Sequence, residues 1–227
     1  MTRAGLSRVW HLAIVLVCLA ALAAQLALVI SGANVLAGAV RPSTAIRLVR
    51  FFSYFTIQSN LLAMGTSALL AARPERDGPT WRVARVAALV GITVTFVVYF
   101  VALRPLARHG GVPWFTNVAF HYVVPLLTIG GWLLFGPRPR IDRASLVRHL
   151  AWPVAYLVWV LAFGAATGWY PYPFFNAARV GYPQALLAAL VITLVLLAVG
   201  WTYHTLDRRL AATTSREPEN RLSSARP

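Results

Sequence analysis

Residues 51–62 read FFSYFTIQSNLL, and this stretch places polar side chains inside the apolar segment 48–72. They are Ser53, Thr56, Gln58, Ser59 and Asn60. On a helix, Ser53, Thr56 and Asn60 fall at positions i, i+3 and i+7 and line one face, while Gln58 points nearly the opposite way. Such a polar stripe is costly in lipid unless it faces a partner. The stretch therefore predicts a membrane helix packed against a second polar segment.

The composition is that of a membrane protein. Of the 227 residues, 59% are hydrophobic and 12% are charged, which is far more apolar than an ordinary soluble domain. Six apolar runs are long enough to cross a bilayer. They are residues 9–30, 48–72, 83–103, 115–135, 147–167 and 182–206. We expect an all-α, polytopic membrane protein, with a transmembrane domain of six helices over residues 1–206 and a polar, disordered tail over residues 207–227.

Arginine supplies all of the basic side chains, and its distribution predicts the orientation. Of the 21 arginines, 15 lie in the N-terminal segment, the second and fourth connections and the tail, and 6 lie in the other three connections. By the positive-inside rule, both termini are cytoplasmic in a multi-pass protein of the cell membrane. The same rule accounts for the net charge of +15, so the lipid bilayer is the expected partner and nucleic acid is not.

The apolar runs contain no carboxylate. All six acidic residues lie between or beyond them, which disfavours an ion-driven transporter but leaves transport of an uncharged solute open. The single cysteine, Cys18, allows neither a disulfide framework nor a thiolate cluster. His11, His149 and His204 lie near the cytoplasmic ends of their spans without any ligand spacing, so no metal or other cofactor is expected.

The best partner for the polar stripe is WFTNVAFHYVVPLL, residues 114–127. Asn117 and His121 are four residues apart on one face, so the amide can hydrogen-bond and orient the imidazole. Pro125 has no N–H, which leaves the carbonyl of His121 without its helical partner and predicts a bend. Counted from the outer side, Thr56 lies roughly 12 Å deep and His121 roughly 9 Å deep. We therefore expect the two side chains at a shared depth.

This pair permits acyl transfer. A threonine hydroxyl becomes an effective nucleophile when a neutral histidine takes its proton, so Thr56 is the candidate nucleophile and His121 the candidate base. Asn60, Asn117 or Ser59 could donate to a developing oxyanion, a stabilisation of about 3 kcal/mol per donor.

Other polar residues belong to the outer half of the bundle. They are Gln25, Tyr99, Thr167 and Gln184, with residues 170–176 as a cap. The prediction is an outward-facing pocket that a lipid ester reaches from the outer leaflet. Arg47 and Arg50 lie above this pocket, where they could hold a fatty carboxylate.

The same residues also admit a structural interpretation. A threonine in a membrane helix commonly bonds to the carbonyl one turn earlier, and Asn60 and Asn117 could do no more than join helices. The alternative function is therefore a noncatalytic membrane protein, such as a small transporter, a lipid binder or an assembly subunit. On that alternative, Thr56→Ser and Thr56→Ala behave alike.

Three motifs resemble a known family: YFTIQSNLL at 54–62, NVAFHYVVPLL at 117–127 and YPYPFFN at 170–176. They resemble a bacterial family of six-span membrane proteins. That family is in turn similar to the androgen-induced and androgen-dependent membrane hydrolases of animals, in which an intramembrane threonine and a histidine form the catalytic pair. Their substrates are fatty acid esters of hydroxy fatty acids. The resemblance implies a lipid ester hydrolase with Thr56 as nucleophile and His121 as base.

Overall fold

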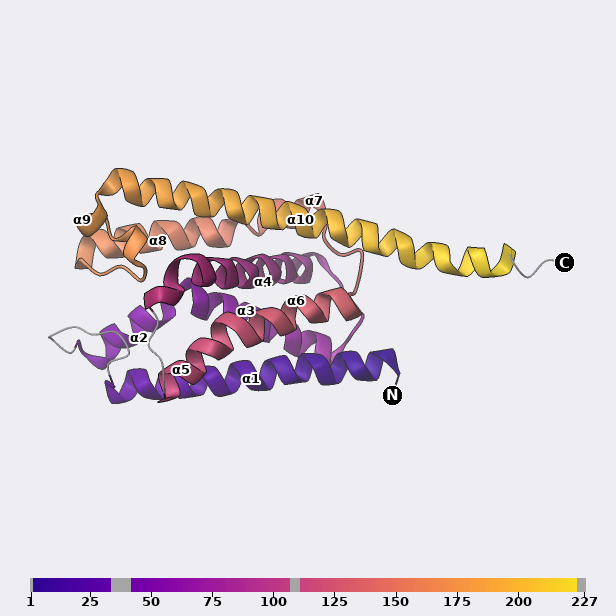
Figure 1. The fold of residues 1–227 in the computed structure, drawn as a ribbon, viewed down its shortest axis with the longest axis horizontal. Helices are drawn as coiled ribbons and strands as arrows, with labels where there is room; N and C mark the ends of the chain where they lie inside the picture. The colour runs from indigo at the N-terminus through magenta and orange to yellow at the C-terminus, as the bar shows by residue number, and fades with distance from the viewer. Residues whose placement is uncertain (1, 34–41, 107–110, 224–227) are drawn as a thin grey trace.

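A computed structural model describes residues 2–33, 42–106 and 111–223, with side chains through residue 212 (Figure 1). No strand occurs in this part of the chain. The α-helices are α1 (Arg3–Ser31), α2 (Thr44–Phe52), α3 (Phe55–Ala72), α4 (Pro79–Val98), α5 (Gly111–Val118), α6 (Val124–Phe135), α7 (Arg143–Arg148), α8 (Ala151–Thr167), α9 (Ala177–Val180) and α10 (Tyr182–Ser223). Two π-turns, η1 (Tyr99–Leu103) and η3 (Ala119–Val123), and two short 3₁₀ helices, η2 (Arg104–Leu106) and η4 (Pro173–Phe175), complete the fold.

Five helical segments of the described chain are long and apolar enough to cross a membrane. They are Arg3–Ser31, Pro79–Leu103, Gly111–Phe135, Arg143–Thr167 and Tyr182–Ala212. The expected all-helical, multi-pass architecture is confirmed to this extent. Segment 48–72 is not among the five. It is divided between α2 and α3, and α3 carries the polar side chains Thr56, Gln58, Ser59 and Asn60.

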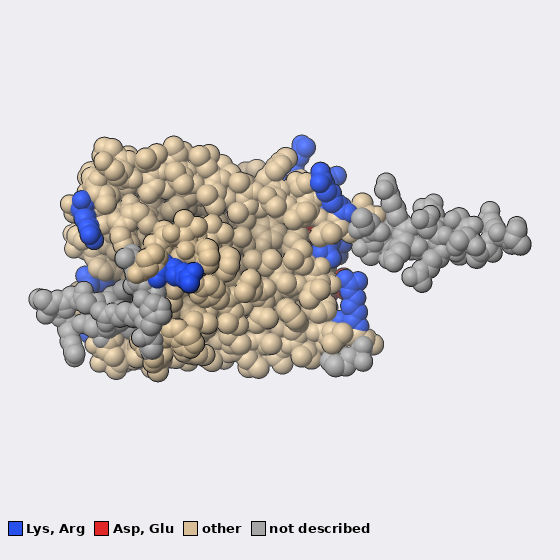
Figure 2. Space-filling view, viewed as in Figure 1, with Lys and Arg blue, Asp and Glu red and all other residues tan. Residues whose placement is uncertain are grey.

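The helices run side by side as an elongated bundle (Figure 1). The N-terminus, connections 73–78 and 136–142, and the far end of α10 lie at one end, which we call the terminal end. Helix α2, residues 168–176 and α9 lie at the opposite end, which we call the loop end. Figure 2 shows arginines towards both ends, with a broad band between them on this face that carries no charged side chain.

The break in segment 48–72 corrects the prediction of one continuous helix. Helix α2 ends at Phe52, Tyr54 adopts an extended conformation with φ −79° and ψ 126°, and α3 begins at Phe55. Ser53 caps α2, and its hydroxyl donates to the carbonyl of Val49 at 2.7 Å. Ser53 therefore does not share a helical face with Thr56, contrary to the expected stripe.

Helix α10 extends beyond Leu206, where the membrane domain was expected to end. Residues 207–212 read DRRLAA and favour a helix. The side chain of Asp207 is buried, and its Oδ2 accepts the backbone N–H groups of Arg140 and Ile141 at 2.6 and 2.9 Å. The segment expected to be a disordered tail is thus helical as far as Ser223, and residues 224–227 lie outside the described chain.

Helix α4 forms the centre of the bundle, and its residues 85–92 are all buried. It packs on α3, α6 and α10. Gly91 permits the closest approach, because a Cβ there would lie 2.8 Å from the ring of Trp152 on α8 and 3.0 Å from the hydroxyl of Ser59 on α3.

Candidate active site

Thr56 is the second residue of α3 and is 7% exposed. The first backbone N–H groups of a helix have no partner within the helix, and no side chain caps the start of α3. The N–H of Thr56 instead donates to the phenol oxygen of Tyr172, at 3.2 Å. The break at Ser53 and Tyr54 thus leaves the amide of Thr56 without a helical carbonyl partner, beside its buried hydroxyl.

His121 lies in the π-turn η3, directly before the helix that contains Pro125. The N–H of Val124 bonds to the carbonyl of Ala119, so a wider turn accommodates the proline that was expected to bend the helix. This turn directs the imidazole towards α3, where Nε2 of His121 lies 3.4 Å from Oγ1 of Thr56. The two residues that the sequence analysis expected at one level of the bundle therefore contact each other.

The hydrogen bond on the other ring nitrogen fixes the tautomer of His121. Nδ1 lies 3.0 Å from the backbone carbonyl of Asn117. Because a carbonyl can only accept, Nδ1 of His121 carries the proton, and Nε2 presents a lone pair to the hydroxyl of Thr56. Tyr99 stacks on the imidazole, with ring centroids 4.0 Å apart, and holds its plane.

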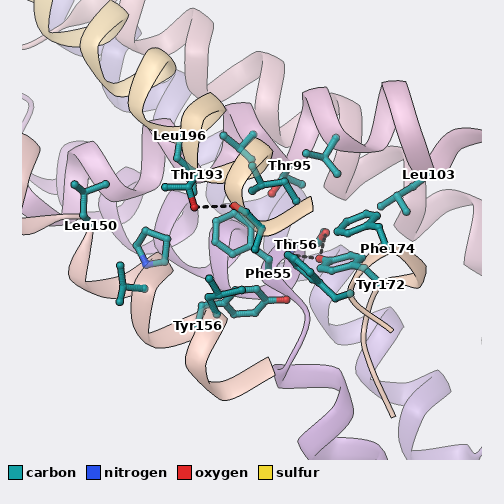
Figure 3. Close-up of a pocket in the computed structure, with 18 residues that line it drawn as sticks. Phe55, Thr56, Thr95, Leu103, Leu150, Tyr156, Tyr172, Phe174, Thr193 and Leu196 are labelled. Carbon is teal, nitrogen blue, oxygen red and sulfur yellow. Dashed lines mark hydrogen bonds between the residues drawn. The ribbon is translucent and has the colours of Figure 1, made fainter. Parts of the chain in front are cut away.

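Tyr172 completes the polar contacts of Thr56. Its hydroxyl lies 3.3 Å from Oγ1 of Thr56, and Figure 3 shows the two side chains pointing towards each other. Burial raises the pKa of the Tyr172 phenol, and its hydrogen bonds with Thr56 oppose that shift only in part. The phenol therefore remains a neutral donor at physiological pH. The sequence analysis assigned Tyr172 only to a capping loop and missed this contact.

An apolar cavity of about 90 Å³ adjoins Thr56 (Figure 3), and His121 does not line it. Its walls come from α3, α4, α8, α10 and the loop with η4, and include Phe55, Val98, Tyr156, Phe174 and Leu196. Val154 also lines the cavity and is 58% exposed. The cavity therefore reaches the outer surface of the bundle beside α8.

Asn60 and Asn117 do not contact the hydroxyl of Thr56. The amide of Asn60 donates to the carbonyls of Thr56 and Phe120, at 2.8 and 3.3 Å. The amide of Asn117 donates to the hydroxyl of Tyr99 at 2.5 Å. The expected bond from this amide to the imidazole of His121 is wrong, because the backbone carbonyl of Asn117 orients the ring instead.

Ser59, Arg47 and Arg50 lie away from the pair. Ser59 is fully buried against Gly91, and its hydroxyl has no partner among the described residues. Each of the three guanidinium nitrogens of Arg47 donates to a carbonyl, those of Val29, Ile30 and Pro42, so Arg47 closes the end of α1. Arg50 stacks over Trp169 at 5.1 Å, and its Nε has no partner in the described chain.

Of the other polar residues expected in the outer half, one joins the candidate site and others bond elsewhere. Tyr99 joins the site through His121 and Asn117. Gln25 accepts a bond from Thr116 at 2.7 Å. Thr167 is exposed and bonds back to the carbonyl of Phe163. In the described part of the chain, no three His, Cys, Asp or Glu side chains gather where they could hold a metal ion.

Comparison of the chain with protein-family models, curated proteins and solved structures finds no match. The interpretation of the site therefore depends on its geometry. A hydroxyl that faces the lone pair of an oriented imidazole, beside a phenol and a backbone amide with no helical partner, is suited to nucleophilic attack on a carbonyl carbon.

Proposed function

We propose that this chain is an integral membrane hydrolase that cleaves a fatty acyl ester, with Thr56 as nucleophile and His121 as base. The observation that carries the proposal is the 3.4 Å contact of Oγ1 with Nε2, together with the bond that holds Nδ1 of His121. A nucleophile and base within reach, with the base oriented by a third group, is the arrangement that covalent catalysis requires.

The topology of the proposal has six membrane crossings, the sixth formed by α2 and α3 together. Both termini are cytoplasmic, in agreement with the positive-inside rule. The loop end and the cavity then belong to the outer half of the cell membrane. Because the break between α2 and α3 lies inside the bundle, its irregular backbone is shielded from lipid, as membrane proteins require.

The reaction has two steps. In the first, Nε2 of His121 takes the hydroxyl proton while the oxygen of Thr56 bonds to the ester carbonyl carbon. The tetrahedral intermediate then breaks its bond to the alcohol, which leaves with the proton from His121. In the second step, the imidazole deprotonates a water that attacks the acyl-threonine, which releases the carboxylic acid and restores Thr56.

Two groups could stabilise the oxyanion. The hydroxyl of Tyr172 lies within 3.3 Å of Oγ1, and the start of α3 carries the partial positive charge of a helix N-terminus. Donors of this kind act strongly in a site from which water is excluded. Asn60 and Ser59 have no place in this step, since the amide of Asn60 is bonded to backbone carbonyls and Ser59 faces Gly91.

The apolar walls of the cavity support a fatty acyl ester as the substrate class. An apolar cavity of about 90 Å³ would hold part of an acyl chain, and the exposed Val154 marks a lateral route from the bilayer. Arg50 is the better candidate to bind the carboxylate of a substrate at the loop end, because each guanidinium nitrogen of Arg47 already donates to a carbonyl.

A fluorophosphonate probe tests the proposal in the purified protein. We expect labelling of the wild type and of Thr56→Ser, no labelling of Thr56→Ala, and a loss of about 100-fold or more in His121→Ala. Thr193→Ala is the matched control, because Thr193 lines the same cavity but bonds back to Ala189. Labelling that survives both Thr56→Ala and His121→Ala rules out the site.

The noncatalytic alternative gives a different pattern. If the polar residues only join helices, Thr56→Ser and Thr56→Ala have equal effects, and any loss of function follows the loss of thermal stability. Measurement of both the probe labelling and the unfolding temperature of each variant therefore separates the two candidate functions.

A further inference from the structure

The most unusual buried group outside the candidate site is the guanidinium of Arg85. Arg85 lies in α4 and is 3% exposed. Its Nε, Nη1 and Nη2 atoms have no hydrogen-bond partner among the described residues. Burial of a charge without a partner is very unfavourable. The sequence analysis counted Arg85 among the flanking arginines, although it lies within the expected span 83–103.

Three other helices each contribute a buried polar atom that lacks a partner in the described chain. These atoms are Nε2 of His11 on α1, Oγ of Ser67 on α3 and Oγ1 of Thr128 on α6. Helix α1 packs on α3 and α6, and α4 packs on the same two helices, so the four surround one interior space.

Local contacts place these atoms at the same end of the bundle. Nε2 of His11 lies 3.4 Å from the position of a Cβ on Gly131, and Thr128 is one turn away on the same helix. Because Ser59 contacts Gly91 and α3 and α4 are antiparallel, Ser67 is level with residue 83, close to Arg85. Ile92, two turns along α4 from Arg85, packs with Ile14 of α1 and Val124 of α6, so Arg85 faces the same two helices.

No carboxylate forms an ion pair with Arg85 within the described residues, and the buried Asp207 instead accepts the backbone N–H groups of Arg140 and Ile141. The ion pairs there join Arg82 and Arg140 to Asp77 and Asp142 at the surface. His11 offers only a neutral lone pair, since its Nδ1 lies 2.8 Å from the carbonyl of Ser7 and donates to it. A neutral acceptor can satisfy one N–H, but it leaves the positive charge uncompensated.

We propose that Arg85 binds a small inorganic anion of the halide class inside the bundle, with the hydroxyls of Ser67 and Thr128 as further donors. A charged donor beside two hydroxyl donors, without a competing carboxylate, is complementary to such an anion. The site lies at the terminal end, away from the cavity beside Thr56, and does not depend on the hydrolase.

A groove of about 780 Å³ at the terminal end provides an approach. Two basic side chains, Arg3 and Arg138, and one acidic side chain, Glu75, line it, and so does Ser7, one turn from His11. Basic side chains at the mouth of a groove raise the local concentration of anions. The anion therefore comes from the aqueous phase at this end.

The test compares sodium bromide with sodium gluconate at equal ionic strength, using the purified full-length chain in detergent. We expect bromide to raise the unfolding temperature of the wild type by a few degrees in a saturable manner, because it binds only the folded state. Arg85→Gln should lose this response. Arg148→Gln should keep it, because Arg148 is exposed on α7 at the same end.

Thr128→Val preserves the size of the side chain and removes one donor, so it should weaken the bromide response several-fold even if Arg85→Gln does not fold. Broadening of the chloride-35 resonance by the wild type, reversed by bromide, provides a direct measurement. If the wild type unfolds at the same temperature in the two salts, no anion binds beside Arg85. That result overturns the proposal. A bromide response that persists in a folded Arg85→Gln variant overturns it as well.

Discussion

The side-chain amide of Asn60 donates to the carbonyl of Thr56 at 2.8 Å and to the carbonyl of Phe120, the residue before His121, at 3.3 Å. One buried amide therefore connects the start of α3 with the π-turn η3. The two proposed catalytic side chains are 65 residues apart in the sequence, and this amide links the backbone segments that carry them.

Replacement of Asn60 should disturb the alignment of Thr56 and His121. We expect Asn60→Ala to lower the free energy of unfolding by about 2 kcal/mol and to reduce kcat for ester hydrolysis with little change in KM. Thr66→Ala is the control, because Thr66 on the same helix bonds only to carbonyls of its own turn. If both variants lose stability and neither loses kcat, the amide does not position the pair.

Tyr172→Phe tests the phenol beside the nucleophile. The change removes the hydroxyl that contacts Oγ1 and the N–H of Thr56. We expect kcat to fall about 100-fold, as when an oxyanion donor is removed. Tyr170→Phe is the matched change in the same loop, because the hydroxyl of Tyr170 interacts with Tyr182 instead. Equal activity of the two variants would argue against a role for Tyr172.

Gly91→Ala should destabilise the contact of α4 with α3 and α8. The new Cβ would lie 2.8 Å from the ring of Trp152, whose indole N–H is held by Gln58 at 2.8 Å. We expect a loss of about 1–3 kcal/mol from overpacking. Gly65→Ala has no atom within 4 Å of its Cβ and should gain up to about 1 kcal/mol in helix propensity. Thermal unfolding of both variants checks the difference.

Acid should remove the stabilisation that the ionised carboxyl of Asp77 provides at the terminal end. Hydrogen bonds from Arg82 hold the pKa of Asp77 well below its ordinary value of 3.8. A carboxyl whose pKa is depressed by folding stabilises the protein above its unfolded pKa, and this contribution is lost as the pH falls through the folded pKa. We therefore expect Asp77→Asn to lower the unfolding temperature at pH 6. The gap from the wild type should narrow progressively below about pH 4, and a gap that is independent of pH would contradict this account.

The helical architecture and a common level for Thr56 and His121 could be predicted because both depend on simple spacings, whereas the contact itself could not. Apolar runs of sufficient length predicted membrane helices, and the depth of each residue along its helix brought Thr56 and His121 to one level. The identity of the group that orients the imidazole could not be predicted. A spacing of four residues places the backbone carbonyl of Asn117 within reach as well as its amide, and only the π-turn decides between them.

Two further features depend on tertiary structure that the sequence does not display. The helix breaks at Ser53 and Tyr54. Neither residue is a glycine or a proline, so the composition of segment 48–72 does not predict the break. Tyr172 reaches Thr56 across 116 residues of sequence. Arg85, in contrast, had a detectable signal, since an arginine inside an apolar run needs a partner.

The interruption at Ser53 and Tyr54 also makes the site vulnerable in an unusual way. In an uninterrupted helix, the amide of Thr56 would donate to the carbonyl of Phe52, four positions earlier. If the proposed function holds, substitutions that restore a continuous helix here would return the amide of Thr56 to the helix and lower activity, although no side chain in contact with substrate is changed. The conformation of the main chain at Ser53 and Tyr54 is thus a requirement of the site, which mutagenesis limited to Thr56 and His121 would overlook.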